Sequence, residues 1–433
     1  MNAVIFDLGT TNFKAAVFSP SLEVIAAASL PTPVRRAEAN RSEIAPDAFL
    51  DAIRQLASRL REAAPQAWRQ IARISFASQA NTFLLIDPAD RPLTPFIVWN
   101  DRRAAELPDL ADRLKRVHDA GAYAQTGIPQ LNCQFTPAKL IWLQQFESDA
   151  WRRTARVLLL ADYLTWWLTG RHTAEASIAA LSGLLDIHTL QWRRDALAEL
   201  DVPLAWMGQP VRSGEPIGPI LRRAADELAL LEGCQVIAGC LDQYAGALGP
   251  GGFAPGYLTE TTGTVLATVA CADRFDSTLS ATGVFQGPAP IPGCYFAMCF
   301  GDVAGVILET YRNQLPDQPT LPELDELASR LPAEQDTVKL DAQHWLTHRE
   351  IRFVGGVEPT RAQAVRAIQR AVAEALAEQV RRIAPQATLI HAAGGAAQSE
   401  SWLRLKSQIV GIPVVTTTPY PTLRGAARLA LGL

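Results

Sequence analysis

The sequence predicts an α/β protein built from two domains, with room for a third. A chain of 433 residues is longer than one hydrophobic core usually serves. Short apolar runs with strand character alternate along it with stretches of helical periodicity. A strand, a Gly-Thr turn and a second strand occur over residues 4–18 and again over residues 257–270. This repeat indicates an internal duplication, which favours two related halves.

Composition argues against several classes of protein. A net charge of −4 gives no electrostatic basis for a nucleic-acid partner. The six cysteines form no CxxC pair, so neither a zinc site nor a disulfide framework is expected. The N-terminus lacks a basic and apolar leader, and no apolar run is long enough to span a bilayer. We therefore expect a soluble cytoplasmic protein with no membrane partner.

Helical signals are clearest in three stretches. Pro46 opens a helix with apolar residues at helical spacing. A capping box between Thr360 and Gln363 starts a long amphipathic helix. Residues 104–206 are expected to be mostly helical, with a strongly apolar helix over Leu158–Leu168. These helices would cover the predicted strands.

The first hairpin, residues 4–18, carries groups that suit phosphate and metal. Gly9 lets a backbone approach a ligand closely. The groups that could act there are Asp7 for a hydrated divalent cation, the Thr10 and Thr11 hydroxyls and amides for phosphate oxygens, and Lys14 for positive charge. The turn lacks the Gly-x4-Gly-Lys-Ser/Thr pattern of a P-loop. An ordinary β-hairpin with a polar turn is the alternative interpretation.

Two further turns suggest nucleotide contacts. Thr262-Gly263-Thr264 repeats the opening arrangement, so phosphates could be bound between the two copies. A strand over Thr388–His391 runs into Gly394 and Gly395, and a helix is expected at about residues 400–410. A Gly-Gly turn in that setting can lie flat against a nucleotide.

Two polar segments that follow strands are candidates for substrate binding and catalysis. Residues 99–103, Trp-Asn-Asp-Arg-Arg, offer an amide and a carboxylate for the hydroxyls of a polyol, and a Trp face for its C–H groups. Asn100 and Asp101 could instead cap the following helix. Asp242 follows a short strand and starts a helix of small residues that reaches Gly249. For Asp242 too, an N-cap role is the structural alternative.

These motifs together resemble the FGGY family of carbohydrate kinases, and the resemblance spans nearly the full length. The segments that carry it are Asp7-Leu-Gly-Thr-Thr-Asn-Phe-Lys14, Trp99-x-Asp101-x-Arg103, Lys139-Leu-Ile-Trp142-Leu, Asp162-Tyr-Leu, Gly239-x-x-Asp242-Gln243, Thr262-Gly263-Thr264, and Gly394-Gly395 with Trp402 downstream. The Asp242-Gln243 segment and the Trp-Asn-Asp-Arg segment make the likeness specific to sugar kinases.

The resemblance implies an α/β fold of two actin-like (ribonuclease H-like) domains with the active site in the cleft between them. Each domain would be a mixed five-stranded sheet flanked by helices. The N-terminal domain, residues 1–249, would hold the sugar, and the C-terminal domain, residues 250–433, would hold most of the nucleotide. ATP and Mg²⁺ are the implied cofactors, the implied partner is a small sugar or polyol, and a homodimer is expected.

The implied reaction is phosphorylation of a primary hydroxyl, with a ketopentose favoured as substrate. Asp242 would be the general base. The implied nucleotide contacts are Thr10, Thr11, Lys14, Gly263, Thr264, Gly394, Gly395 and Gln398. The implied substrate contacts are Gln79, Asn100, Asp101, Arg102, Asp242 and Gln243. Asp7 would hold Mg²⁺ through water.

Three departures from the family pattern keep a second function open. Gln79-Ala80-Asn81 replaces the Gln-Met-His of many xylulokinase-like members. Tyr420 stands where many members have Glu, and residues 315–355 look shortened. The alternative is a nucleotide-binding regulatory protein of the same fold without sugar turnover. A chaperone-like ATPase is a third and weaker hypothesis. The sequence does not identify the sugar.

Overall fold

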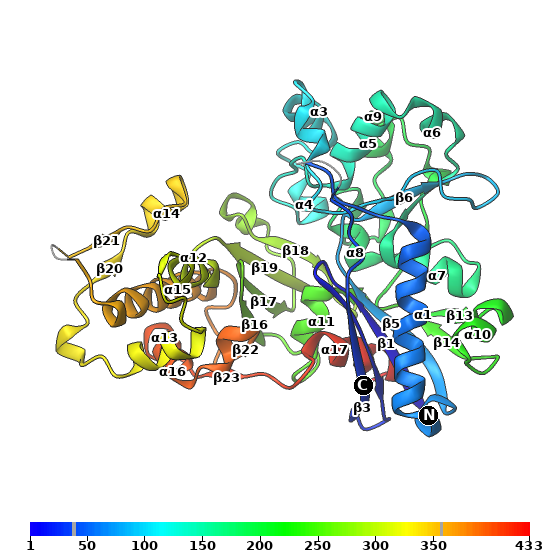
Figure 1. The fold of residues 1–433 in the computed structure, drawn as a ribbon. Helices are drawn as coiled ribbons and strands as arrows, with labels where there is room; N and C mark the ends of the chain where they lie inside the picture. The colour runs from blue at the N-terminus through cyan, green and yellow to red at the C-terminus, as the bar shows by residue number, and fades with distance from the viewer. Residues whose placement is uncertain (37–39, 356–357) are drawn as a thin grey trace. The chain divides into compact units, whose positions relative to one another are not determined.

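The computed structural model describes residues 1–36, 40–355 and 358–433 (Figure 1). The surface loop expected over residues 31–46 and the turn expected over residues 354–357 lie partly outside these ranges. The chain forms two compact units. The first contains Met1–Gly252, Asp273–Phe296 and Tyr420–Leu433, and the second contains Phe253–Ala272 and Ala297–Pro419.

A mixed sheet forms the centre of the first unit. Its order is β13-β14-β5-β1-β2-β3, and β15 also pairs with β5. The strands are β1 Asn2–Leu8, β2 Asn12–Phe18, β3 Val24–Pro31, β5 Ile71–Ser78, β13 Pro216–Pro219, β14 Gln235–Ile237 and β15 Cys240–Leu241. Because β14 and β15 both run parallel to β5, they form one interrupted strand. With that strand counted once, the sheet has the five expected strands plus the edge strand β13.

The second unit repeats this arrangement. Its strands β16 Leu258–Thr262, β17 Leu266–Ala272, β19 Tyr295–Gly301, β22 Ile390–Ala393 and β23 Val414–Thr416 follow the order β19-β17-β16-β22-β23. The first two residues of β19 are assigned to the first unit. In each unit the hairpin strand β1 or β16 pairs antiparallel on one side and parallel on the other. This shared strand order supports the internal duplication that the two Gly-Thr turns predict.

Three smaller sheets are formed by strands in the first half of the chain. They are β4 Glu43–Ile44, β7 Phe96–Ile97, β6 Phe83–Ile86 and β8 Arg156–Leu159 in one sheet; β9 Thr173–Glu175 with β12 Gln209–Val211; and β10 Leu185–Asp186 with β11 Gln191–Trp192. Three further short strands remain. β18 Phe285–Pro288, whose residues belong to the first unit, is next to β19 in the strand order, and β20 Lys339–Leu340 pairs with β21 Phe353–Val354 in the second unit.

Helices pack on the main sheet of each unit or on one another. Those of the first unit are α1 Pro46–Ala63, α2 Pro65–Trp68, α3 Leu110–Val117, α4 Tyr123–Thr126, α5 Thr136–Phe146, α6 Ser148–Arg153, α7 Leu160–Thr169, α8 Ala176–Ala180, α9 Arg194–Glu199, α10 Arg222–Leu228, α11 Asp242–Leu248 and α17 Pro421–Leu431. Those of the second are α12 Gly305–Gln314, α13 Leu321–Ser329, α14 Ala342–His348, α15 Arg361–Ile383 and α16 Glu400–Val410. Among them, α1, α7 and α17 pack on the main sheet of the first unit, and α15 packs on that of the second. Figure 1 shows α1 along the first sheet and α15 beside the second.

Local sequence explains how several of these helices form. Pro46 occupies the first turn of α1, whose apolar face is buried against β2 and β3. The capping box of Thr360 and Gln363 starts α15 as predicted. The apolar run at 158–168 is not one helix, because its first two residues belong to β8 and α7 begins at Leu160. None of the helices described is long and apolar enough to cross a membrane.

The two units differ from the domain ranges expected from the sequence at the boundary residues 250–252 and at the longer segments 273–296 and 420–433. Both longer segments belong to the first unit, although they follow residue 249. The reason for the second is close packing of α17 on α11, where a β-carbon on Gly425 would lie 1.9 Å from the Ala245 carbonyl oxygen. The small residues after Asp242 therefore allow another helix to approach closely.

Candidate active site

Three parallel strands of the first unit end at the same edge of the sheet. Asp7 of β1 pairs with Ala77 of β5, which also pairs with Cys240 of β15. Asp7 lies one residue before the end of β1, and Asp242 directly follows β15. The sheet register therefore brings two carboxylates that are 235 positions apart in sequence (242 − 7) to one edge.

Asp242 is the first residue of α11, and its carboxylate is only partly exposed. Its Oδ1 accepts a hydrogen bond of 2.7 Å from the Gln243 backbone N–H. The N-cap residue of α11 is Leu241, so the capping alternative for Asp242 is not what the structure has. Burial raises the pKa of Asp242 to about 7, and the negative charge of Asp7 adds to the rise.

Asp7 is 6% exposed and faces a lysine across the hairpin. Burial raises its pKa to about 6, while Lys14 opposes the rise because its Nζ lies 3.9 Å from Asp7 Oδ2. This distance follows from the register, in which Asp7 and Lys14 are cross-strand neighbours. Lys14 is 45% exposed, so it compensates the Asp7 charge only in part.

The first turn is held by side chains from other segments. The Thr10 hydroxyl accepts a hydrogen bond of 2.7 Å from the Trp99 indole N–H and donates to Gln79 Oε1 at 3.4 Å. Thr11 is exposed. A β-carbon on Gly9 would lie 2.9 Å from the Asn12 carbonyl oxygen, so the turn itself requires this glycine.

Gln79, predicted as a substrate contact, is 3% exposed and acts as an internal brace. Its Nε2 donates to the carbonyl oxygens of Leu8 and Gly9, each at 3.2 Å. Its Oε1 accepts from the Thr82 hydroxyl at 3.1 Å. These bonds fix the end of β5 to the hairpin turn and occupy both ends of the amide.

Asp101 is fully buried, and its two oxygens accept four hydrogen bonds. Oδ1 accepts from the Arg103 N–H and Nε at 3.0 and 2.9 Å. Oδ2 accepts from the Ser42 N–H at 2.7 Å and from Arg103 Nη2 at 2.9 Å. A carboxylate has about four acceptor positions, so none is left for a substrate hydroxyl. The bond from the Arg103 N–H satisfies the first backbone N–H of the short 3-10 helix Arg103–Glu106, although the N-cap position of that helix is Arg102.

Other predicted substrate contacts, unlike Asp101, have polar groups that are available to a ligand. Asn100 Oδ1 is buried and has no hydrogen-bond partner within the described part of the chain. A buried acceptor in that state is expected to meet water or a ligand. Arg102 and Gln243 are at least partly exposed, so their side chains can also reach a small molecule.

Lys139 organises this region, although residue-level reasoning gave it no role. Its ammonium is fully buried and donates to the carbonyl oxygens of Asn81, Val98 and Trp99 at 3.1, 2.9 and 3.0 Å. Burial lowers the pKa of Lys139 to about 7. The signal in the sequence is a single lysine within the otherwise apolar run Pro137–Leu143 of the predicted helix. It fixes the 79–82 and 96–100 segments relative to each other.

A second buried network positions the residue before Asp242. Glu175 is 1% exposed and accepts from the hydroxyls of Ser177 at 2.6 Å and Ser213 at 2.7 Å. The Ser177 hydroxyl in turn accepts from the Leu241 N–H at 2.9 Å. Burial raises the pKa of Glu175. Sequence reasoning missed this network because its members come from three separate segments.

In the second unit, the two predicted nucleotide turns lie at neighbouring strand ends. Thr261 of β16 pairs with Ala393 of the parallel strand β22, so the Gly263 and Gly394 turns follow at one edge. A β-carbon on Gly394, whose φ is +83°, would lie 3.3 Å from the Thr262 carbonyl oxygen. The fold itself therefore requires Gly394.

Gly263 and Gly395 differ from Gly394 in a way that suits ligand binding. Both are exposed, and no atom lies within 4 Å of the position a β-carbon would take. The surrounding fold does not require glycine at either position, so the missing side chains leave the backbone accessible. Thr264 and Gln398 beside them are also exposed.

The carboxylates of the first unit suit a divalent cation that is bound mainly by nucleotide phosphates, and not a metal ion held by protein side chains alone. Among the described residues there is no group of three or more His, Cys, Asp or Glu that could hold a metal ion. Mg²⁺ bound to nucleotide phosphates needs only one or two protein carboxylates, often through water. Asp7, buried and close enough to Asp242 to raise its pKa, has the incompletely compensated charge that such an ion would neutralise.

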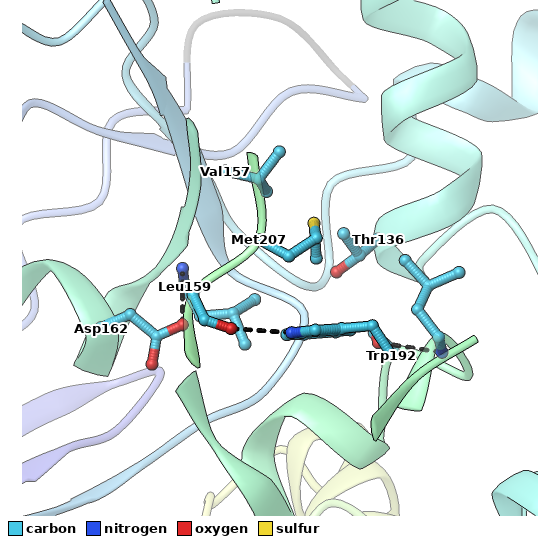
Figure 2. Close-up of a pocket in the computed structure, with 9 residues that line it drawn as sticks. Thr136, Val157, Leu159, Asp162, Trp192 and Met207 are labelled. Atoms are coloured by element: carbon cyan, nitrogen blue, oxygen red, sulfur yellow. Dashed lines mark hydrogen bonds between the residues drawn. The ribbon is translucent and has the colours of Figure 1, made fainter. Parts of the chain in front are cut away.

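A small cavity elsewhere in the first unit is not a substrate site. Figure 2 shows Thr136, Val157, Leu159, Asp162, Trp192 and Met207 around it. Trp192 Nε1 donates to the Gly208 carbonyl oxygen at 2.7 Å, which closes one side. The volume is about 10 Å³, which is room for about one water molecule.

The family comparison assigns the N-terminal part of the chain. Residues 2–249 match the model described as the FGGY family of carbohydrate kinases, N-terminal domain. This match covers more than half of the sequence. The chain therefore belongs to the FGGY family of carbohydrate kinases.

Some individual relatives match only part of the chain, and others match nearly all of it. A xylulose kinase from Lactococcus lactis is 29% identical over 248 residues, which are 57% of this chain and only 48% of the relative. A glycerol kinase from Aromatoleum aromaticum is 27% identical over 456 aligned residues, covering 98% of this chain and 88% of the relative. The solved structure of a xyloylose kinase from Brucella ovis has a TM-score of 0.88 and 27% identity, covering 100% of this chain and 90% of that one. The chain thus has the two-domain, actin-like fold of this family.

Proposed function

We propose that the protein transfers a phosphoryl group from ATP to a primary hydroxyl of a small sugar or polyol, with a ketopentose as the favoured substrate. The observation that carries this proposal is the pair of strand-end carboxylates, Asp7 and Asp242. A base is most effective when its pKa lies near the working pH, and the pKa of Asp242 is raised to about 7. Asp242 would accept the proton of the attacking hydroxyl.

The substrate contacts follow from which polar groups remain available. Asn100 Oδ1 would accept a hydrogen bond from a substrate hydroxyl, and Arg102 and Gln243 would donate to others. Gln79 and Asp101 act indirectly in this proposal, because their polar atoms already bind other segments. Trp99, 37% exposed, offers an aromatic face to the C–H groups of a sugar.

The nucleotide would contact the exposed turns. In the first unit these groups are Thr10, Thr11 and Lys14, and in the second they are Gly263, Thr264, Gly394, Gly395 and Gln398. Mg²⁺, when bound with ATP, would supply charge neutralisation for the transferred phosphoryl group, and Asp7 would hold it through water. Positioning and electrostatics supply most of the catalysis in phosphoryl transfer, which suits backbone turns and carboxylates.

The substrate class rests on the relatives, whose names include xylulose, glycerol and glucono-kinases. We favour a ketopentose among these acceptors. Dependence on ATP favours a cytoplasmic location. The expected homodimer stays a prediction.

A turnover screen tests the proposal. ADP release is measured with ATP, Mg²⁺ and a panel of pentuloses, hexuloses, glycerol, tetritols and gluconate. We expect one pentulose to raise ADP release at least about 10-fold above the sugar-free rate, as expected when a correctly positioned acceptor replaces water. ADP release that no acceptor increases would contradict the proposal, and preference for another acceptor would overturn the ketopentose assignment.

A further inference from the structure

Beneath the second glycine turn lies a buried ion pair whose position bears on nucleotide binding. Lys406 of α16 and Glu260 of β16 both have fully buried side chains, and Lys406 Nζ lies 2.5 Å from Glu260 Oε1. Thr262 closes a ring with them. Its hydroxyl accepts from Lys406 Nζ at 2.9 Å and donates to Glu260 Oε2 at 2.8 Å.

Stability alone does not explain these residues. Removing two charges from water is costly, and well-packed apolar residues of similar volume often stabilise a core as well or better. The buried face of α16 is otherwise apolar, with Trp402, Leu403 and Leu405 on the same side as Lys406. An apolar residue at 406 would continue that face. A buried ion pair does, however, fix direction and register, because its geometry is narrow.

The ring connects the two turns that the proposed function assigns to the nucleotide. Thr262 is the last residue of β16 and directly precedes Gly263. Lys406 lies on α16, the helix that follows the Gly394-Gly395 turn. Gly394 also packs against the Thr262 carbonyl oxygen.

Lys406 also contacts a residue of its own helix, α16. Its ammonium lies 5.1 Å from the ring of Trp402, one turn earlier on α16. The Trp402 indole N–H donates to the Gln369 carbonyl oxygen on α15 at 3.1 Å. The position of the cation is thus coupled to the helical layer of the unit as well as to the end of β16.

We propose that the Glu260–Lys406–Thr262 ring is a positioning device, which holds the Gly263-Thr264 and Gly394-Gly395 turns in the mutual arrangement that binds the nucleotide. The proposal rests on the proposed function, because it takes these turns to be the nucleotide site. The three residues act through the backbone and are not themselves ligands. Loss of the ring should weaken nucleotide binding and leave sugar binding in the first unit unchanged.

The main test replaces the whole ion pair, because a single charge left buried would destabilise the fold. The double variant Glu260→Leu/Lys406→Met keeps the volume and removes both charges. Leu405→Met, a buried change on the same helix outside the ring, is the matched control. Binding of Mg²⁺ with a non-hydrolysable ATP analogue is measured by calorimetry, and amide hydrogen exchange is measured without nucleotide.

We expect the double variant to bind the analogue about 10-fold more weakly, a size typical of altered coupling between sites. Its amides at 263–265 and 394–398 should exchange faster than in the wild type and in the control. A folded double variant with unchanged affinity and unchanged exchange would overturn the proposal. Faster exchange together with a wild type that binds no nucleotide would instead overturn the proposed function.

A gentler pair of variants keeps the test decisive if the double variant does not fold. Thr262→Ser retains the hydroxyl, whereas Thr262→Val removes it and leaves the ion pair in place. We expect wild-type affinity for the ATP analogue in the serine variant and a loss of about 3- to 10-fold in the valine variant. Equal affinity in both would overturn the role of the ring.

Discussion

The carboxylates at the strand ends that carry the proposed site differ between the two units. In the first, burial raises the pKa of Asp7 to about 6 and of Asp242 to about 7, and the two carboxylates repel each other. In the second, Glu260 is more deeply buried, yet Lys406 neutralises it at 2.5 Å. In our account the paired Glu260 carboxylate positions the backbone around it. The Asp7 and Asp242 carboxylates are not fully neutralised by a neighbouring cation, so they remain available to a metal ion or a proton. The first unit therefore carries the chemistry in our account, and the second provides a scaffold for the nucleotide.

The largest expected effect comes from removing the base. Asp242→Asn should lower kcat by roughly 10²-fold or more, because the amide cannot accept the hydroxyl proton. The matched control is Asp112→Asn, a change at an exposed aspartate on α3 that should leave kcat unchanged. ADP release measures both. Near wild-type turnover in Asp242→Asn would contradict the claim that the first unit supplies the catalytic base.

A smaller effect is expected at the second carboxylate of the pair. Asp7→Asn should lower kcat by about 10-fold at a fixed Mg²⁺ concentration, since a charged ligand acting through water is replaced by a neutral one. The Mg²⁺ concentration for half-maximal activity should rise. A titration of activity against Mg²⁺ measures this shift, and an unchanged midpoint would assign the metal elsewhere.

Lys139 tests whether the first unit also needs a buried positioning cation. Lys139→Met should raise the KM for the sugar by about 10-fold, because three backbone carbonyls lose their donor and the 79–82 and 96–100 segments loosen. The KM for ATP should stay within about 2-fold of wild type. Lys115→Met, at an exposed lysine, is the control. Equal increases in both KM values would indicate general destabilisation instead.

The smallest expected effect concerns stability against pH. The pKa of Asp242 is raised on folding, so the folded state binds this proton more tightly than the unfolded state. The carboxylate therefore destabilises the fold progressively as pH rises from about 4 to about 7, and by a constant amount above that. Asp242→Asn should have a Tm about 1–3 °C higher than wild type at pH 8 and a similar Tm at pH 4. A Tm of Asp242→Asn below that of the wild type at pH 8 would contradict the prediction that the ionised Asp242 carboxylate destabilises the fold.

Much of the fold could be predicted because its signals are local. The repeated strand–turn–strand pattern, the capping box at Thr360 and the proline start of α1 each depend on residues close in sequence. The apolar run at 158–168 was wrongly predicted as one helix, since such a run cannot separate a buried strand from a helix. The place of α17 in the first unit depends on its contact with α11, which no local pattern encodes.

The candidate site was less predictable, because the use of a polar side chain depends on distant partners. Gln79 and Asp101 were predicted to contact substrate, but their polar atoms bind Leu8, Gly9, Ser42 and Arg103. Lys406 and Glu260 are 146 positions apart, and neither has a motif that indicates the other. Asp242 could be singled out because it directly follows a strand end.

The most direct test of the account is the titration of the Asp242 carboxyl group in the free protein. Carbon-13 NMR of aspartate-labelled wild type, with the Asp242 signal assigned by its absence in Asp242→Asn, measures the pKa. Our account predicts a value of about 7, and a lower value in Asp7→Asn because the neighbouring charge is removed. A pKa near the ordinary 3.8, unaffected by residue 7, would contradict the claim that the first unit keeps a proton-accepting carboxylate ready at its sheet edge.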